Sequence, residues 1–454
     1  MIVHSSALQQ CVARGLVGLA AALAGCGGGG GSSTSTPDAS VDCSVPAQQT
    51  WLRDYMNEWY FWYRQAPAPS LAAYPTLDSY FAARLFTGDA TFPRDRYSFS
   101  QSTTSFDQFY GEGKTLGYGV FVAGVEVTGR PDLPLRVRYV EPLSDAAARG
   151  VQRGDEVLTL NGRAASDAIT ANDFSALTPR AVGDVLVLQL RSATGIRSVT
   201  LTASAYTLSP VSGATLLRSP AGRNMGYVMV KDMISQTAPG LQSAFAQFKA
   251  AGVSELILDL RYNGGGLVST AGEVASYASG ARANGGIFTT LAYNDRRAAT
   301  NNETFRFSTP TAALALPRVF VLTGSRTCSA SELVINGLRG IGVEVVAIGS
   351  TSCGKPVGFL PAAHCDSTFN VVNFESLNAR GQGRYFDGFA PTCVVADDLT
   401  HALGAADEAL VAAARGYADS GVCPAAASRE AAAARRGASA DTTEPGERQG
   451  MVAR

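Results

Sequence analysis

Ser329 is placed where a serine could act as a nucleophile. It follows an apolar run at 319–322 and precedes Glu332 and a helical apolar pattern over 330–338. The carboxyl end of a strand is where α/β folds place ligands, and the positive end of the next helix, with the Ala330 amide, would stabilise an oxyanion. Ser329 and Glu332 also form the S-x-x-E pattern of a helix cap, which requires no catalytic function.

A nucleophilic serine needs a base, and the sequence offers few. Of the three histidines, one lies near the N-terminus, while His364 and His401 have no evident aspartate partner. Lys355 comes soon after the next apolar run, 343–349, so neighbouring strand ends in one sheet would bring it towards Ser329. Burial lowers the pKa of a lysine towards the neutral form that accepts a proton. We therefore expect a Ser-Lys dyad.

Two other motifs share this lysine. Gly349-x-x-x-x-Gly354-Lys355 approaches a phosphate-binding loop, but Pro356 stands where Ser or Thr must hold magnesium. Ser352-x-x-Lys355 has the β-lactamase spacing, which requires a helical turn that Gly354 and Pro356 disfavour. We therefore expect neither motif to function, and a Ser-Lys mechanism requires no metal ion or organic cofactor.

A glycine-rich turn follows the apolar run at 256–260. The glycines at 264–266 leave backbone N–H groups without Cβ obstruction, which suits the binding of an oxyanion. On its own, such a turn needs no ligand.

Alternating strand and helix patterns place these segments in one α/β core, assigned to residues 208–424, with substantially parallel strands. Apolar runs such as LILDL indicate strands that are buried on both faces. Strands are expected at 226–230, 256–260, 319–322 and 343–349, and helices at 241–251, 269–279 and 330–338. Residues 425–454 are polar and low in large apolar side chains, which predicts a disordered tail.

Two further domains are expected before this core, making the fold class multi-domain α/β. Aromatic residues at helical spacing predict a helical domain over 43–104, with helices at 48–65 and 78–86, and we interpret this aromatic stripe as core. Residues 105–207 are strand-rich, and the stretch from GYGV through GDEVLTLNG resembles a PDZ domain. That resemblance implies capture of a peptide's terminal carboxylate by loop amides, those of Tyr118, Gly119 and Val120. The alternative is a β-rich spacer that has lost its peptide.

The N-terminus resembles a lipoprotein signal. Residues 1–25 contain an apolar core that is too short to span a bilayer. It ends in LAGC, which resembles a bacterial lipobox, so we expect Cys26 to be lipidated. A Gly/Ser-rich tether, 26–42, follows. The alternative is an ordinary secretory signal with a chance cysteine. We expect a protein anchored by lipid in the bacterial cell envelope.

The composition excludes several classes of protein. The 454 residues are 46% hydrophobic with a net charge of -1, which allows large cores and argues against a general nucleic-acid binder. No C-x-x-C pair indicates a zinc ribbon or a thioredoxin-type site. The cysteines fit an oxidising compartment, and the folded part keeps Cys43, Cys328, Cys353, Cys365, Cys393 and Cys423.

In order and spacing, these motifs resemble the C-terminal processing peptidases of family S41. DLRYNGGG, then SASE from Ser329, then GK 26 residues after that serine, lie behind a PDZ-like region and a helical cap. The resemblance covers roughly residues 105–400. It implies that Ser329 is the nucleophile, that Lys355 is the general base, and that an oxyanion hole is formed by the amides of Gly264, Gly265 and Ala330.

One departure from the family pattern concerns the lysine. Such peptidases often carry a glutamine four residues after it, where this chain has Phe359. Glu332 is a candidate to hold Lys355 instead. A Cys328–Cys353 disulfide would brace the site, Cys353–Cys365 is equally compatible, and Cys43–Cys423 would join the two ends of the folded part.

The resemblance implies a cell-envelope serine endopeptidase. The PDZ-like domain would capture the free C-terminus of a protein or peptide substrate, and the lipid would hold the enzyme at a membrane. Phe359 favours the alternative of a non-catalytic peptide-binding lipoprotein on the same scaffold. A regulator with a vestigial catalytic half is a second alternative.

Overall fold

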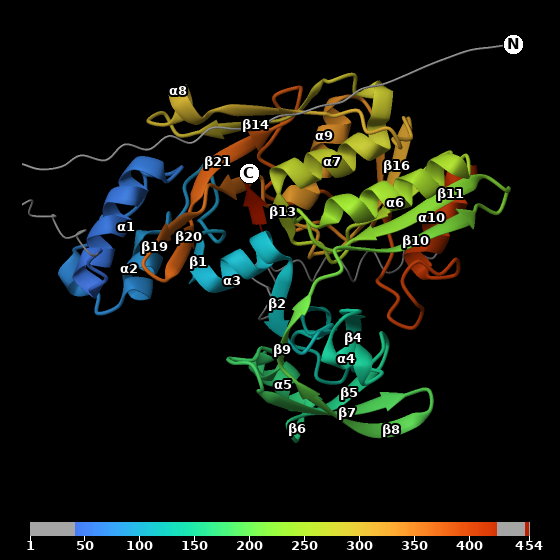
Figure 1. Cartoon of the computed structure of the whole chain (residues 1–454), viewed down its shortest axis with the longest axis horizontal. Coiled ribbons are helices and arrows are strands. Elements are labelled where there is room, and N and C mark those ends of the chain that lie inside the picture. Colours follow the sequence, from blue (N-terminus) through green and yellow to red (C-terminus); the bar gives the residue numbers. More distant parts are fainter. Residues whose placement is uncertain (1–40, 425–449, 454) are drawn as a thin grey trace, which may run out of the picture. The chain divides into compact units, whose positions relative to one another are not determined.

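The computed structural model describes residues 41–424 and 450–453 (Figure 1). Of these residues, those from Cys43 onward form one compact unit. The predicted signal peptide, the lipidation site Cys26, nearly all of the tether and residues 425–449 lie outside the described residues. Within the described part, none of the helices combines the length and the apolar character that a membrane span needs.

The α/β core is built on a sheet with the strand order β10-β11-β12-β16-β17-β22. Its strands are Val211–Arg218, Asn224–Val230, Glu255–Asp259, Arg318–Thr323, Glu344–Gly349 and Cys393–Val394. The strands from β11 to β22 pair in parallel, and β10 pairs with β11 in the antiparallel sense. The prediction of a mostly parallel α/β core is therefore confirmed.

Helices cover both faces of this sheet, as the apolar runs require. Leu256 and Leu258 of β12 pack with α6, α7 and α9, whereas Ile257 between them packs with α10 on the opposite face. Alternate side chains of a strand point to opposite faces, so a strand covered twice must be apolar throughout. The helices are α6 (Thr237–Ala250), α7 (Val268–Ser279), α9 (Ala330–Gly340) and α10 (Ala409–Ser420).

A second sheet has the order β13-β23-β18-β21-β14-β15. Its strands are Gly265–Leu267, Gly450–Val452, Val357–Phe359, Val372–Leu377, Ile287–Tyr293 and Glu303–Arg306. Strand β23 belongs to the segment for which the sequence predicts disorder, and that prediction is wrong for residues 450–452. The strand forms because neighbours distant in the chain pair with both of its edges.

The helical domain contains α1 (Val45–Trp59) and α2 (Leu77–Arg84), both predicted. The first helix ends earlier than expected, because Tyr60 is extended. Strand β1 (Phe99–Ser102) pairs with β20 (Ser367–Asn370), which attaches the domain to the rest of the unit. Trp62 of the aromatic stripe is buried in a cluster with residues of β18, Trp51 and Tyr55 pack against that cluster, and Trp59 packs against the α/β core, so the stripe is core only in part.

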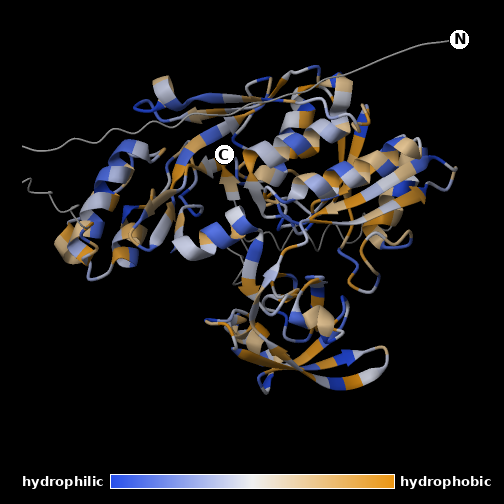
Figure 2. Ribbon diagram, in the orientation of Figure 1, coloured by the Kyte–Doolittle hydropathy of each residue, from blue (hydrophilic) through white to orange (hydrophobic). Residues whose placement is uncertain are grey.

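The β-rich domain begins at β2 (Lys114–Gly117) and ends at β9 (Ser204–Thr207), which pair with each other. Residues 103–112 are helical rather than extended. Between β2 and β9 in the chain lies a sheet with its own apolar cluster and the strand order β3-β4-β5-β7-β8. Burial alternates along β7 and over the second half of β8, and both strands carry hydrophobic and hydrophilic residues (Figure 2). The sheet strands are β3 (Val120–Val122), β4 (Leu135–Val140), β5 (Glu156–Leu160), β7 (Val185–Ser192) and β8 (Gly195–Thr202).

Disulfides connect Cys43 with Cys365, Cys328 with Cys353, and Cys393 with Cys423. The expected Cys328–Cys353 bond is confirmed, and the Cys353–Cys365 and Cys43–Cys423 pairings are wrong. Cys43 precedes α1, which packs beside the β19–β20 hairpin (β19, Ala362–His364) that carries Cys365. Cys423 follows α10, and Cys393 lies in the edge strand β22. Residues of α10 and Cys393 pack in the same cluster, on one face of the core sheet.

Candidate active site

Ser329 lies in the turn between β16 and α9, in a strained backbone conformation. Its φ and ψ are 63° and -117°, which non-glycine residues rarely adopt. A nucleophilic serine on a sharp strand-to-helix turn is held in this way. The side chain is buried, and its hydroxyl has no hydrogen-bond partner among the described residues.

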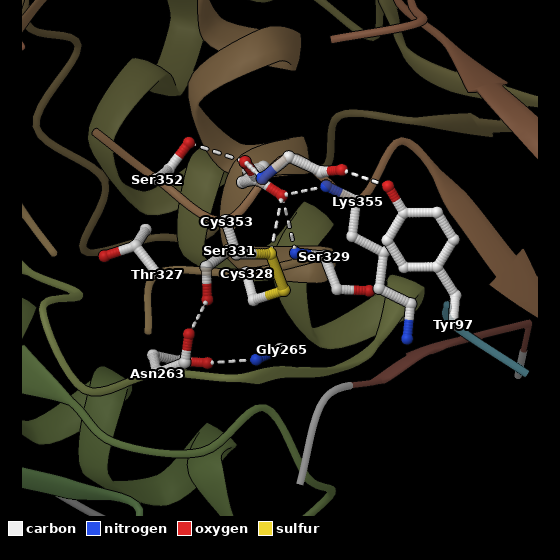
Figure 3. The surroundings of a disulfide bond; sticks show 12 residues. Tyr97, Asn263, Gly265, Thr327, Cys328, Ser329, Ser331, Ser352, Cys353 and Lys355 are labelled. Carbon is white, nitrogen blue, oxygen red and sulfur yellow. Dashed lines mark hydrogen bonds between the residues drawn. A yellow bond between two sulfur atoms is a disulfide. The ribbon is translucent and has the colours of Figure 1, made fainter. Parts of the chain in front are cut away.

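Glu332, in the first turn of α9, binds the serine segment to the lysine segment, and Figure 3 labels its partners Ser329, Ser352 and Lys355. Its carboxylate accepts hydrogen bonds from the amides of Ser329 at 2.9 Å and Lys355 at 2.8 Å, both at Oε2. Oε1 accepts from the Gly354 amide at 2.9 Å and the Ser352 hydroxyl at 2.5 Å. Burial raises the pKa of Glu332, and these hydrogen bonds oppose the shift by stabilising the carboxylate. Glu332 therefore positions the backbone of Lys355.

A disulfide fixes the same two segments. Cys328 adjoins Ser329, Cys353 precedes Lys355, and their sulfur atoms are bonded. The sulfur atoms lie close enough to the Glu332 carboxylate to suggest a metal site. Because both sulfurs are in the disulfide, no thiolate is left to bind a metal there.

Lys355 is fully buried, and burial lowers its pKa from the ordinary 10.5 to about 7. The charges of Asp95 and Glu332 oppose that shift. The lysine Nζ lies 4.1 Å from the ring centroid of Phe359 and 5.9 Å from that of Tyr97. Phe359 thus lies against the amine from the position where the family pattern has a glutamine.

The predicted oxyanion amides lie together but are not equivalent. A Cβ placed on Gly265 would lie 2.9 Å from the Ala330 nitrogen, so these two residues are neighbours. The Gly265 amide, however, donates to Asn263 Oδ1 at 2.7 Å. The expectation that Gly265 donates to an oxyanion is therefore not met in this structure, because the Asn263 side chain binds the amide first. Gly264 and Ala330 remain the candidate donors.

Several residues of the site carry no signal in the sequence. Tyr97, from the helical domain, donates to the carbonyl of Gly354 at 2.7 Å, directly before the lysine. Asp95, from the same segment, acts on the lysine pKa. These contacts are tertiary, so no local motif could reveal them. Asn263 is the exception, because it lies inside the DLRYNGGG motif. Its position directly before the glycines could have indicated that it contacts them.

The two histidines lie elsewhere in the fold. His401 follows β22, and its Nδ1 lies 2.5 Å from Asp398 Oδ2, so the expectation of no aspartate partner is wrong for this residue. The partner is three positions away along the same loop. His364 is in β19 and stacks on Trp51 with the ring centroids 4.3 Å apart.

A cavity of about 280 Å³ lies between the β-rich domain and the core. Its lining includes the whole predicted peptide loop, Tyr118, Gly119 and Val120, and also Gly264 of the site. Arg326, three residues before Ser329, lines it too and forms an ion pair with Glu126 of the β-rich domain. The loop and the candidate oxyanion glycine therefore border one continuous space.

Comparisons with known proteins agree with this arrangement. Residues 224–394 match the family model described as Peptidase family S41, and residues 47–99 match the Peptidase S41 N-terminal domain. The chloroplastic carboxyl-terminal-processing peptidase 3 of Arabidopsis thaliana is 29% identical over 255 residues, which cover 54% of this chain and 46% of that protein. The chloroplastic C-terminal processing peptidase of Tetradesmus obliquus is 32% identical over 168 residues, covering 34% and 35%. The chain thus spans about half or less of these relatives.

A solved structure extends the likeness to nearly the whole described fold. A candidate S41 protease of Bacteroides fragilis superimposes with a TM-score of 0.64 at 25% sequence identity. The superposition covers 82% of this chain and 98% of that one.

Proposed function

Because the chain belongs to peptidase family S41, we propose that it is a serine endopeptidase in which Ser329 is the nucleophile and Lys355 the general base. The observation that carries the proposal is the single carboxylate of Glu332. It binds the amides of both residues, and so brings together a strained serine and a buried lysine from separate strand ends.

The reaction would proceed through an acyl-enzyme. Neutral Lys355 takes the hydroxyl proton as Ser329 Oγ attacks the scissile carbonyl, and the oxyanion is stabilised by the amides of Gly264 and Ala330. The C–N bond then breaks, and the lysine ammonium gives its proton to the departing amine. Water attacks the ester and gives its proton to Lys355, the ester C–O bond breaks, and the lysine ammonium returns that proton to Ser329 Oγ as the acid leaves.

The lowered pKa makes lysine usable as this base. With a pKa of about 7, roughly half of the Lys355 side chains are neutral at pH 7. At the ordinary value of 10.5, only about one in three thousand would be. Burial thus supplies the base without a histidine.

We extend the proposal to substrate capture and location. The loop at 118–120 would bind the C-terminus of a protein or peptide substrate, and the shared cavity would lead the chain to Gly264. The lipobox-like segment supports a lipid-anchored protein of the bacterial cell envelope, on sequence alone.

Cleavage of an unfolded protein such as casein tests the assignment. Ser329→Ala should abolish cleavage with the fold intact by circular dichroism, and Lys355→Ala should do the same. Ser276→Ala is the matched control, because Ser276 is also a buried serine of the core but binds the Gly272 carbonyl within α7. Retained cleavage by Ser329→Ala would overturn the assignment. Absence of cleavage by the unaltered protein, with peptide binding preserved, would favour the non-catalytic alternative.

A further inference from the structure

The C-terminal strand β23, the dark red arrow near β13 in Figure 1, lies in the sheet between β13 and β18, which belong to the two segments that form the candidate site. It pairs in parallel with β13, which follows the oxyanion turn, and with β18, which follows Lys355. The Gly450 amide donates to the Gly264 carbonyl at 3.0 Å, and the Ala453 amide donates to the Phe359 carbonyl at 3.0 Å. The strand is thus hydrogen-bonded on both edges to the site.

Glycines make room for the backbone of this strand. A Cβ on Gly265 would overlap the carbonyl oxygen of Gly450, and one on Gly358 would lie 2.6 Å from that of Met451. A Cβ at residue 450 would itself overlap the Tyr110 hydroxyl. The groove between β13 and β18 therefore accepts an extended peptide closely, with glycine at this one position.

The strand also fills the groove with apolar side chains. Met451 is 0% exposed and Val452 is 1% exposed, and Val452 packs against Leu267 and Ile234. Ser329 and Lys355 are 0% exposed in the same structure. A second peptide cannot pair with β13 and β18 while β23 occupies their edges.

We propose that residues 450–453 are a built-in ligand of the peptide groove, which competes in cis with substrate for the place beside Ser329. The inference rests on the proposed function, because it assigns to that groove the binding of the cleaved chain. Strand addition supplies main-chain hydrogen bonds, and side-chain pockets add selectivity. Because the segment belongs to the same chain, its effective concentration at the groove is on the order of millimolar. A free peptide must compete with that concentration, so its apparent affinity for the groove is lowered.

Peptide binding without catalysis tests this inference. Fluorescence anisotropy of a labelled Gly-Met-Val-Ala-Arg peptide is measured on the Ser329→Ala protein, either full length or ending at Gln449. We expect the shortened protein to bind about tenfold or more tightly, which is the ratio that a millimolar effective concentration gives for a segment with a Kd of about 0.1 mM or lower. Equal affinity for the two proteins, or no binding to the shortened one, would overturn the proposal.

A substitution tests the same point in the full-length chain. In the Ser329→Ala background, Met451→Asp buries a charge in the groove and should expel β23, so that the peptide binds as it does to the shortened protein. Ile196→Asp is the matched control: Ile196 is 58% exposed on β8, and its replacement should leave the affinity at the full-length value. Met451→Asp with full-length affinity would contradict cis competition.

The two proposals fail separately. If Ser329→Ala retains cleavage but the shortened protein still binds the peptide more tightly, only the catalytic assignment is lost. If cleavage depends on Ser329 but peptide affinity is independent of residues 450–454, only the built-in ligand is lost. When both hold, the shortened enzyme with Ser329 intact should show a higher kcat/KM than the full-length enzyme.

Discussion

Replacing Phe359 by leucine should move the acid limb of the pH–rate profile to lower pH. The Lys355 Nζ lies 4.1 Å from the Phe359 ring centroid, and the face of an aromatic ring stabilises an ammonium ion but not a neutral amine. Leucine keeps an apolar cover, and hence the burial that lowers the pKa of Lys355 to about 7. The substitution removes only the aromatic ring, so the ammonium form of Lys355 is less stabilised.

The size of the shift follows from the contact. A cation–π interaction at a desolvated site contributes about 1–2 kcal/mol, and one pKa unit corresponds to about 1.4 kcal/mol. The pKa of Lys355 should therefore fall by about one unit in Phe359→Leu. Phe359→Gln should have the opposite effect, because a hydrogen bond from the ammonium to the amide oxygen is worth about 1.5–3 kcal/mol.

The pH dependence of kcat/KM for a fluorogenic peptide reports the pKa of the free enzyme's base. Phe369→Leu is the control: Phe369 is buried in the same cluster and packs on Phe81 with centroids 5.6 Å apart. The Phe369→Leu protein should be less stable, but the acid limb of its pH–rate profile should not move. The reasoning is refuted if Phe359→Leu raises the apparent pKa, or if Phe369→Leu shifts it equally.

Three further changes test the framework of the site. Glu332→Gln replaces one accepting oxygen by an NH2 group, which must then face either the Ser329 and Lys355 amides or the Gly354 amide, so we expect cleavage to be lost and urea unfolding to show a loss of about 2–4 kcal/mol. Cys328→Ser with Cys353→Ser opens a link of sequence separation 25 and should cost about 3 kcal/mol, with reductant producing the same loss in the unaltered protein. The pKa of Lys355 is about 7 when folded and 10.5 otherwise, so the unfolded chain binds the extra proton and stability rises with pH between these values. Lys355→Met should abolish that rise and add about 4 kcal/mol at pH 7, whereas a flat curve for the unaltered protein would contradict the shift.

The elements of the core could be predicted because burial on both faces leaves a strong pattern. LILDL, VFVL and VEVVAIG are apolar throughout, and each became a parallel strand of the core sheet. Strand β23 could not be predicted, because its residues Gly-Met-Val follow a long polar segment. Its formation depends on glycine-lined edges supplied by residues far away in the chain.

The site was predictable to the extent that strand ends define it. Ser329 and Lys355 follow neighbouring strands, and parallel pairing of β16 with β17 brings those ends to one edge. The S-x-x-E pattern by itself indicated only a helix cap, and the family resemblance alone made Glu332 a candidate to hold Lys355; its carboxylate reaches the lysine segment through the tertiary fold. The same limit applies to Asn263, whose side chain takes the Gly265 amide.

The protonation of Lys355 depends on opposing effects from different parts of the chain. Burial by the surrounding core favours the neutral amine, whereas the charges of Asp95 and Glu332 and the face of the Phe359 ring favour the ammonium. With the carboxylates alone, the lysine would remain protonated and inert as a base. With burial alone, its pKa would fall below 7, and the ammonium would be a better acid for the leaving amine but the amine a poorer base for Ser329. Because Asp95 belongs to the helical domain, that domain contributes to the base strength of a residue in the core, where burial has the largest effect.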